Sequence, residues 1–323
     1  MQIDQSKVKN ILVVRNDRFG EFLLNIPAFR ALRESFSSAR IIAAVDPAVK
    51  ELALSVPYLD ETFPWEGKKH SLSEKLRLAG QLKAKKIDIA IMLNPSQEFN
   101  LVCFLAGIPV RAGYNRKWGF LLNRKIPDKK ALGLKHEVEY NLELAQAIGA
   151  KTADKSIKLN IAQSLAQELV LAARLDEQKD FVVLHPWSSD PVKLWPREKF
   201  SELAELLAEE LKLKVVVVGA VKNPAFPAIS GSTLIDLTGK TTLTQLALIL
   251  KRAKLLVSAD SGPVHLACAV GCPVIALFRN DLPGKTAKRW GPRGEKTKII
   301  ESNNLAQISA QEVFLTVKEI LKR

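Results

Sequence analysis

Short apolar runs alternate along the chain with longer stretches in which apolar residues recur every three or four positions. Continuous apolar runs of this length are typical of strands buried on both faces, and the longer stretches have the period of amphipathic helices. The alternation therefore predicts βα units and parallel sheets. We expect strands at 10–15, 39–45, 87–93, 110–113, 181–185, 214–220, 234–239, 254–260 and 273–278.

The helical pattern separates these strands and divides the chain into two similar halves. We expect helices at 21–36, 72–86, 197–212, 242–253 and 262–270. The polar stretch 150–158 is the candidate linker between the halves. The pattern predicts two doubly wound, Rossmann-like domains at 1–155 and 156–323 that face a central cleft, with ligands at the carboxyl ends of the strands. The last helix is a candidate for packing back on the N-terminal domain.

Composition narrows the class of protein. The 323 residues are 47% hydrophobic, no run approaches the roughly 20 apolar residues of a membrane span, and the first residues lack the pattern of a signal peptide, so we expect a soluble, cytoplasmic protein. The three cysteines have no metal-ligand spacing, and Cys268 and Cys272 are expected to be small core residues. We therefore expect no metal site and no disulfide framework.

The net charge of +14 points to anionic partners. Between Arg111 and Lys135, eight basic residues accompany one acid, Asp128. This segment is either a solvated basic face or a surface for an anionic acceptor or lipid headgroups.

The segment SADSGPVHLA at 258–267 is the clearest candidate for a binding site. It predicts a buried strand that ends at Asp260, followed by a helix that begins near Gly262. The free N–H groups and positive dipole end of such a helix suit a phosphate, and Ser261 and His265 add donors. Ser or Asp before Pro263 also forms an ordinary helix start, so the segment alone leaves both interpretations open.

Two further strand ends carry candidate chemistry. In RNDRFGE at 15–21, Glu21 is either a general base or a helix N-terminal acid stabilised by the dipole, and Asp17 is a second candidate base. In HPWSSDPVKLWP at 185–196, Ser188 and Ser189 can donate hydrogen bonds, and Lys193 is suited to a diphosphate. We expect Trp195 to pack beneath this loop and His185 to be structural.

Several common motifs are missing from the chain, among them GxxxxGK[ST], GxGxxG, HExxH and GxSxG. Their absence disfavours P-loop ATPases, dinucleotide oxidoreductases and the common metallo- and serine hydrolases. Group transfer from an activated, phosphorylated donor remains open.

Four segments in order, RNDRFGEFLLNIPAFRALRE, HPWSSDPVKLWP, LTGKTTLTQLALIL and SADSGPVHLACAVGCPVIALF, resemble the family 9 glycosyltransferases, which include the ADP-heptose:lipopolysaccharide heptosyltransferases. The resemblance spans residues 15–278 and implies the GT-B fold. It also implies that the first domain binds the acceptor, that the second binds a nucleotide-sugar, and that transfer inverts the anomeric carbon without an essential metal.

The resemblance also implies roles for individual residues. The family's Gly-Asp pair, whose carboxylate is the proposed base, is Gly20-Glu21 here, a longer acid that leaves Asp17 as the alternative base. Asn223 stands where many relatives have an acid that holds the ribose. The implied donor-binding residues are Ser188, Ser189, Lys193, Asn223, Thr241, Thr242, Leu243, Asp260, Ser261, Gly262 and His265, and the acceptor-binding candidates are Arg18, Arg111, Arg116, Lys117 and Arg124.

We therefore expect a monomeric glycosyltransferase that moves a sugar, most simply heptose from ADP-heptose, to a lipopolysaccharide-core or related anionic glycan acceptor. Contact with the cytoplasmic face of the inner membrane is expected, without nucleic acid. The alternatives are a nucleotide-sugar epimerase or hydrolase of the same fold, and a non-enzymatic basic protein that binds acidic membrane or nucleic acid.

Overall fold

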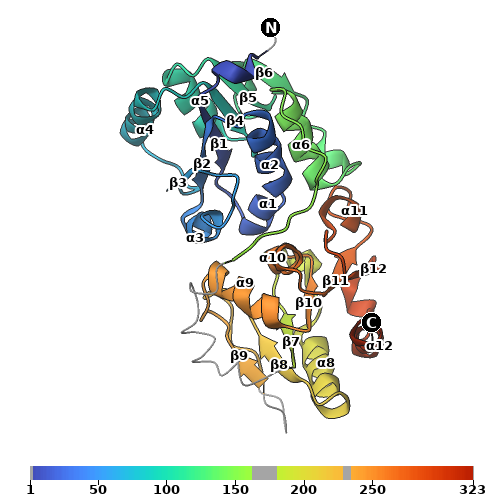
Figure 1. Ribbon diagram of the computed structural model, residues 1–323. Helices are drawn as coiled ribbons and strands as arrows, with labels where there is room; N and C mark the ends of the chain where they lie inside the picture. Colours follow the sequence, from blue (N-terminus) through green and yellow to red (C-terminus); the bar gives the residue numbers. More distant parts are fainter. Residues whose placement is uncertain (1–2, 162–179, 228–233, 323) are drawn as a thin grey trace. The chain divides into compact units, whose positions relative to one another are not determined.

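The computed structural model describes residues 3–161, 180–227 and 234–322, and these form two compact units, Met1–Ser156 and Ile157–Arg323 (Figure 1). Each unit contains a six-stranded parallel sheet with helices around it. The expected α/β architecture with two parallel sheets is confirmed.

The sheet of the N-terminal unit has the order β3-β2-β1-β4-β5-β6, and all of its pairs are parallel. Its apolar strands are buried on both faces, and α4 and α5 pack on one side through residues such as Leu82 and Phe99. The elements are β1 (Asn10–Arg15), α1 (Phe19–Leu23), α2 (Ile26–Ser35), β2 (Arg40–Val45), α3 (Lys50–Ala53), β3 (Glu61–Pro64), α4 (Leu72–Ala84), β4 (Ile89–Met92), α5 (Gln97–Leu105), β5 (Val110–Tyr114), β6 (Arg124–Ile126) and α6 (Glu137–Gln146).

The sheet of the C-terminal unit has the order β12-β11-β10-β7-β8-β9 and is also parallel throughout. The last helix, expected as a candidate for packing on the first domain, buries Val313, Phe314 and Val317 in the core of its own unit, against α8. The elements are β7 (Phe181–His185), α8 (Arg197–Glu210), β8 (Lys214–Val217), β9 (Leu234–Asp236), α9 (Leu243–Arg252), β10 (Leu255–Ala259), α10 (Gly262–Val270), β11 (Val274–Arg279), α11 (Ala287–Trp290), β12 (Thr297–Ser302) and α12 (Ala310–Leu321).

The helix expected at 21–36 is in fact two helices, α1 and α2. Pro27 has no N–H to donate to the carbonyl of Leu23, so the helical hydrogen-bond ladder is interrupted there. The break leaves α1 as a single short turn that carries Glu21.

Three strands, β3, β6 and β12, were not expected, and each lies at an edge of its sheet. Edge strands are partly exposed, so their sequences ETFP, RKI and TKIIES have no continuous apolar run. Strand β9 ends earlier than expected because Asp236 accepts a hydrogen bond from the backbone N–H of Thr238 at 2.8 Å, which forms a local turn. Among the described helices, none is long and apolar enough to cross a membrane.

Trp195 lies beneath the loop that follows β7, as expected, and is 1% exposed. Its indole Nε1 donates to the carbonyl of Ile308 at 3.0 Å, and its ring meets Phe200 edge-on with centroids 4.6 Å apart. Trp195 thus joins the β7 loop to α8 and to the segment before α12.

We predict that Trp195→Ala lowers the free energy of unfolding of the C-terminal unit by about 3–5 kcal/mol, because it opens a cavity in this core. Urea denaturation followed by circular dichroism measures the change. Leu315→Ala, on the exposed face of α12, is the matched control and should change stability by less than about 0.5 kcal/mol. Equal effects of the two substitutions would contradict this account of the core.

Candidate active site

The strand order of the N-terminal sheet reverses between β1 and β4 (Figure 1). From β1 the chain continues to β2 and β3 on one side, and it then returns to β4, β5 and β6 on the other. The loops that leave β1 and β4 therefore diverge, and ligands of open α/β sheets bind at such switch points. The segment RNDRFGE leaves β1 at this place.

Arg15 is the last residue of β1 and its side chain is only 2% exposed. Its Nη1 donates to the carbonyl of Leu93 at 3.0 Å, after β4, and its Nε lies 2.8 Å from Oδ1 of Asp17. Its Nη2 forms a short ion pair with Glu21. One buried guanidinium thus holds both candidate bases. Sequence reasoning missed Arg15, although a single arginine at the end of the apolar run ILVVR was a usable signal.

The two carboxyl groups differ in their affinity for protons. Burial raises the pKa of Asp17 to about 7, and the negative charge of Glu21 acts in the same direction against the opposing effect of Arg15. Burial also acts to raise the pKa of Glu21, but ion pairs with Arg15 and Arg18 outweigh it and hold the pKa at about 2. Of the two carboxyl groups, Asp17 is therefore the more readily protonated, and Glu21 carries the negative charge near neutral pH.

Arg18 differs from Arg15 in its exposure. Its side chain is 70% exposed, and its Nη2 pairs with Oε1 of Glu21. An exposed guanidinium can leave this ion pair for a phosphate or carboxylate of a ligand at little cost.

A second group of side chains surrounds the end of β1 and was not anticipated from the sequence. Asn16 donates to the carbonyl of Trp65 at 3.2 Å and accepts from Asn94 at 3.2 Å. Glu98 accepts from the Trp65 indole at 2.9 Å and lies 2.8 Å from His70, whose ring stacks on Trp65. These contacts hold the loop after β3 beside β1. Residues so far apart in the chain give no local pattern that predicts them.

The basic candidates do not gather in one place. Arg116 and Lys117 follow β5 at the carboxyl edge of the sheet, the edge that also carries Arg18. Arg111 lies in the first half of β5 and donates to the carbonyls of Leu121 and Ile108 at 2.8 and 2.5 Å, so it supports a loop.

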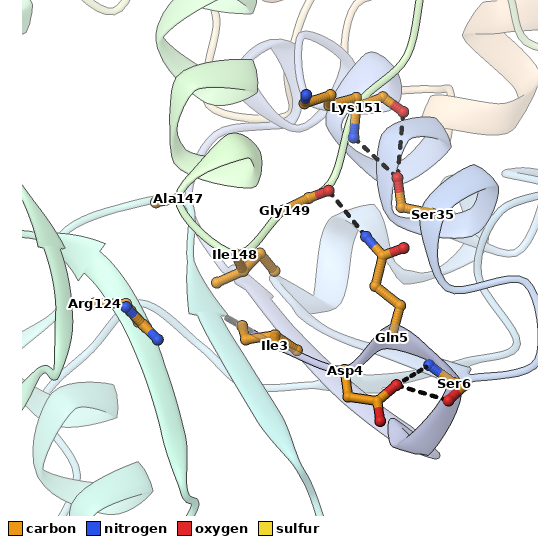
Figure 2. A pocket seen from close by; sticks show the side chains of 10 residues that line it. All are labelled: Ile3, Asp4, Gln5, Ser6, Ser35, Arg124, Ala147, Ile148, Gly149 and Lys151. Atoms are coloured by element: carbon orange, nitrogen blue, oxygen red, sulfur yellow. Dashed lines mark hydrogen bonds between the residues drawn. The ribbon is translucent and has the colours of Figure 1, made fainter. Parts of the chain in front are cut away.

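Arg124 begins β6 and lines a cavity of about 980 Å³ with Gln5, Ser35, Gly149 and Lys151 (Figure 2). The cavity is formed by the segment before β1 and the segment after α6, that is, at the amino edge of the sheet. Arg124 therefore lies away from Arg18 and Glu21.

The C-terminal sheet has its own switch point, between β7 and β10. The loop after β7 carries Lys193, and β10 is followed by Asp260. Their side chains form a short, largely buried ion pair. The structure thus brings together two donor-binding candidates that are 67 residues apart in the sequence.

Ser261 is the N-cap residue of α10, but its side chain does not cap the helix. Its Oγ instead lies 2.8 Å from Oγ of Ser258, which in turn lies 3.0 Å from Nδ1 of His185. The side chain of Ser261 therefore does not supply the acceptor of an ordinary N-cap, and N–H groups at a helix start can bind an anion. His185 is buried, and burial lowers its pKa to about 4.

The remaining donor-binding candidates have mixed surroundings. Ser188 is half-buried and accepts from the N–H of Asp190 at 3.3 Å, and Ser189 is exposed. Thr242 caps α9 through the N–H of Gln245 at 3.2 Å, between the partly buried Thr241 and Leu243. Asn223 accepts from the N–H of Ala220 at 2.8 Å and so closes its own turn. Gly262 begins α10, and His265 is buried one turn inside it.

The three cysteines are buried and unpaired, and burial raises the pKa of each thiol to about 12. Among the described residues, no group of three or more His, Cys, Asp or Glu side chains could hold a metal ion.

Comparison with known proteins identifies the chain's relatives. The family model "Glycosyltransferase family 9 (heptosyltransferase)" matches residues 75–317. The chain belongs to glycosyltransferase family 9. Lipopolysaccharide heptosyltransferase 2 of Salmonella typhimurium is 27% identical over 311 residues, which cover 90% of this chain and 87% of that protein.

Two solved structures share the fold of this family 9 glycosyltransferase. The E. coli ADP-heptose lipopolysaccharide heptosyltransferase II has a TM-score of 0.82 at 24% identity, covering 97% of this chain and 98% of that one. A family 9 glycosyltransferase from Veillonella parvula has a TM-score of 0.84 at 21% identity, covering 99% of each chain. The expected GT-B fold and transferase class are confirmed, and the epimerase, hydrolase and non-enzymatic alternatives are not favoured.

We predict that acid destabilises the C-terminal unit of this glycosyltransferase through His185. The pKa of His185 in the folded protein, about 4, lies below its ordinary value. Between pH 6.5 and 4, His185 is therefore protonated in the unfolded chain but largely neutral in the folded protein. Stability is complete above about pH 6.5 and falls as the pH drops.

Urea denaturation at pH 7 and pH 5 tests this linkage. His185→Asn keeps a polar atom near the position of Nδ1 but does not titrate, so the wild type should lose about 2 kcal/mol more than the variant between the two pH values. An equal loss in both proteins would show that His185 does not carry the acid sensitivity.

Proposed function

We propose that this glycosyltransferase moves heptose from ADP-heptose to an anionic lipopolysaccharide-core acceptor, with inversion at the anomeric carbon. The observation that carries the proposal is the Lys193–Asp260 pair beside the uncapped start of α10, at the switch point of the C-terminal sheet. A cation and a helix N-terminus together suit the diphosphate of a nucleotide-sugar. The heptosyltransferase names of the relatives support heptose as the sugar.

In this proposal the C-terminal unit binds the donor. Lys193, Ser188 and Ser189 contact the phosphates from the β7 loop, and Ser261 and Gly262 contact them from α10. Asp260 contacts the sugar once Lys193 turns to the diphosphate, and His265 supports the site from within the helix. The nucleoside lies toward β8 and β9, where its proposed contacts are Asn223, Thr241, Thr242 and Leu243.

The N-terminal unit binds the acceptor in this proposal. Arg18, Arg116 and Lys117 share the carboxyl edge of the sheet with Glu21 and are the residues that would meet anionic groups of the acceptor. Arg111 and Arg124 contribute less directly, because one supports a loop and the other lies at the amino edge. We also propose that the enzyme works as a monomer at the cytoplasmic face of the inner membrane.

The proposed reaction is a direct displacement. Glu21 accepts the proton of an acceptor hydroxyl, the hydroxyl oxygen bonds to the anomeric carbon, and the bond from that carbon to the diphosphate oxygen breaks. Lys193 and the first amides of α10 stabilise the charge that develops on the leaving diphosphate, so no metal is required in this scheme. Binding of an anionic acceptor group to Arg18 removes one of the ion pairs of Glu21 and makes it a stronger base.

Transfer is tested by incubating the full-length protein with ADP-heptose and a heptose-deficient lipopolysaccharide core, and by measuring heptosylated product together with ADP. Release of ADP without acceptor would instead indicate a hydrolase. A thermal-shift screen of ADP-, UDP-, GDP- and TDP-sugars tests the nucleotide, because a ligand that binds the folded state raises its stability.

We predict different kinetic effects for Glu21 in the N-terminal unit and for Lys193 in the C-terminal unit. Glu21→Gln should lower kcat by about 10²- to 10⁴-fold with nearly unchanged donor affinity, because it removes the base. Lys193→Ala should weaken ADP binding by about 10- to 100-fold, because it removes a charged contact to the diphosphate. Calorimetric titration with ADP and steady-state kinetics separate the two effects. A Glu21→Gln enzyme with normal kcat would refute the assignment of the base.

We predict that the transfer rate rises with pH through about 7. Asp17 ionises in this range, and its second negative charge beside Glu21 increases the affinity of Glu21 for the incoming proton. Asp17→Asn has the same shape without the charge, so it should transfer sugar with a flat profile from pH 6 to 8.5. If Asp17→Asn abolishes transfer while Glu21→Gln retains it, Asp17 is the base.

A further inference from the structure

The turn that follows β5 exposes two large aromatic side chains. Trp118 is 43% exposed and Phe120 is 71% exposed, with their ring centroids 6.3 Å apart. Phe104, at the end of α5, is also exposed and lies beneath the guanidinium of Arg111, which donates to the carbonyl of Leu121 in the same turn. We call residues 115–121 the aromatic turn. Both rings are therefore partly exposed on the surface of the N-terminal unit.

The aromatic turn is held in an unfavourable backbone conformation. Lys117 and Trp118 have φ values of 47° and 67°, in the left-handed region that side chains with a Cβ rarely adopt. The buried Asn100 donates to the carbonyl of Lys117 at 2.9 Å, and Leu121 donates its N–H to the carbonyl of Trp118 at 3.0 Å.

Gly119 completes the turn, because a Cβ there would lie 2.9 Å from Oδ1 of Asn115 and 3.3 Å from the carbonyl of Tyr114. The exposure of Trp118 and Phe120 is thus a fixed feature of the fold. Strained conformations that the surroundings maintain in this way often mark functional segments.

The segment that contains the aromatic turn and β6 carries cations whose side chains have different surroundings. Within the basic segment 111–135, Arg111 points to backbone carbonyls, Lys130 is buried against Glu137, and Arg116 pairs with Asp128 at 3.1 Å. Lys117, Lys125 and Lys129 are exposed and make no ion pair with the described residues. Lys125, in β6, is the register partner of Gly113 near the end of β5.

We propose that the aromatic turn docks the protein on a bilayer that contains anionic phospholipid. Trp118 and Phe120 enter the boundary between headgroups and acyl chains, and Lys125 and Lys129 face the lipid phosphates. Aromatic rings favour this boundary, and basic residues add attraction to an anionic surface. Only the purpose of this surface rests on the proposed function: it brings the carboxyl edge of the N-terminal sheet to a lipid-borne acceptor.

A bilayer suits these residues better than a second copy of the chain does. An isologous contact of the aromatic turn with itself would bring the unpaired lysines of two copies together and would be opposed by their repulsion. A surface of phosphate groups instead complements these lysines, while rings at the tip of a rigid turn can insert without burying an unpaired charge.

The proposal is tested by co-sedimentation of the full-length protein with vesicles of phosphatidylcholine that contain 30% phosphatidylglycerol. We expect the double variant Trp118→Ser/Phe120→Ser to bind at least tenfold more weakly than the wild type. The matched control Leu54→Ser/Leu315→Ser, which removes equally exposed leucines elsewhere, should bind like the wild type. Lys125→Gln/Lys129→Gln should bind at least threefold more weakly to these vesicles, and its affinity should depend less on the salt concentration.

Fluorescence gives a second, direct measurement. Brominated phosphatidylglycerol vesicles should quench the emission of Trp118, and Trp118→Phe should lose that quenching while it still binds. Transfer to a lipid-free core oligosaccharide should be unchanged in Trp118→Ser/Phe120→Ser, which also shows that the variant is folded.

The vesicle experiments require no sugar transfer, so their outcome is independent of the donor and acceptor proposed above. Wild-type protein that does not bind the anionic vesicles, or aromatic variants that bind as tightly as the wild type, would overturn the proposal. A wild-type dimer in solution that the aromatic substitutions convert to a monomer, without vesicle binding, would assign the surface to self-association.

Discussion

The buried guanidinium of Arg15 determines the arrangement of the N-terminal site. A charge that is almost completely removed from water must be paired and hydrogen-bonded, or it destabilises the fold severely. Arg15 donates to the carbonyl of Leu93 and to the carboxylate of Glu21, and it forms an ion pair with Asp17, so two acids at the end of β1 turn toward the same point. The positions of both candidate bases follow from the burial of one cation.

The C-terminal unit also contains a largely buried ion pair, whose cation is more exposed to solvent than Arg15 is. Lys193 and Asp260 neutralise each other where the loops after β7 and β10 meet. Because a diphosphate carries more charge than one carboxylate, it can take Lys193 from Asp260, and this exchange leaves the carboxylate available to a sugar hydroxyl. In the proposed mechanism, the ion pair neutralises the two charges when no donor is bound and separates when a donor binds.

The hydrophobic pattern was sufficient to predict the two parallel sheets, because central parallel strands are buried on both faces and have continuous apolar sequences. It was insufficient for β3, β6 and β12, which lie at sheet edges and are partly exposed. Local signals also predicted that Glu21, Lys193 and Asp260 lie at strand ends. They could not show that Arg15 joins Asp17 to Glu21, or that Lys193 meets Asp260, since these contacts depend on which strands are neighbours.

The basic segment illustrates the same limit in more detail. Eight cations lie within 25 residues of the sequence and look like one feature, but their side chains have different roles in the fold. Arg111 supports backbone carbonyls, Lys130 neutralises a buried glutamate, and Arg124 faces a cavity at the other edge of the sheet. Lys117, Lys125 and Lys129 are exposed and make no ion pair with the described residues, so the charge of this segment that is available to an external anion is smaller than its eight cations indicate.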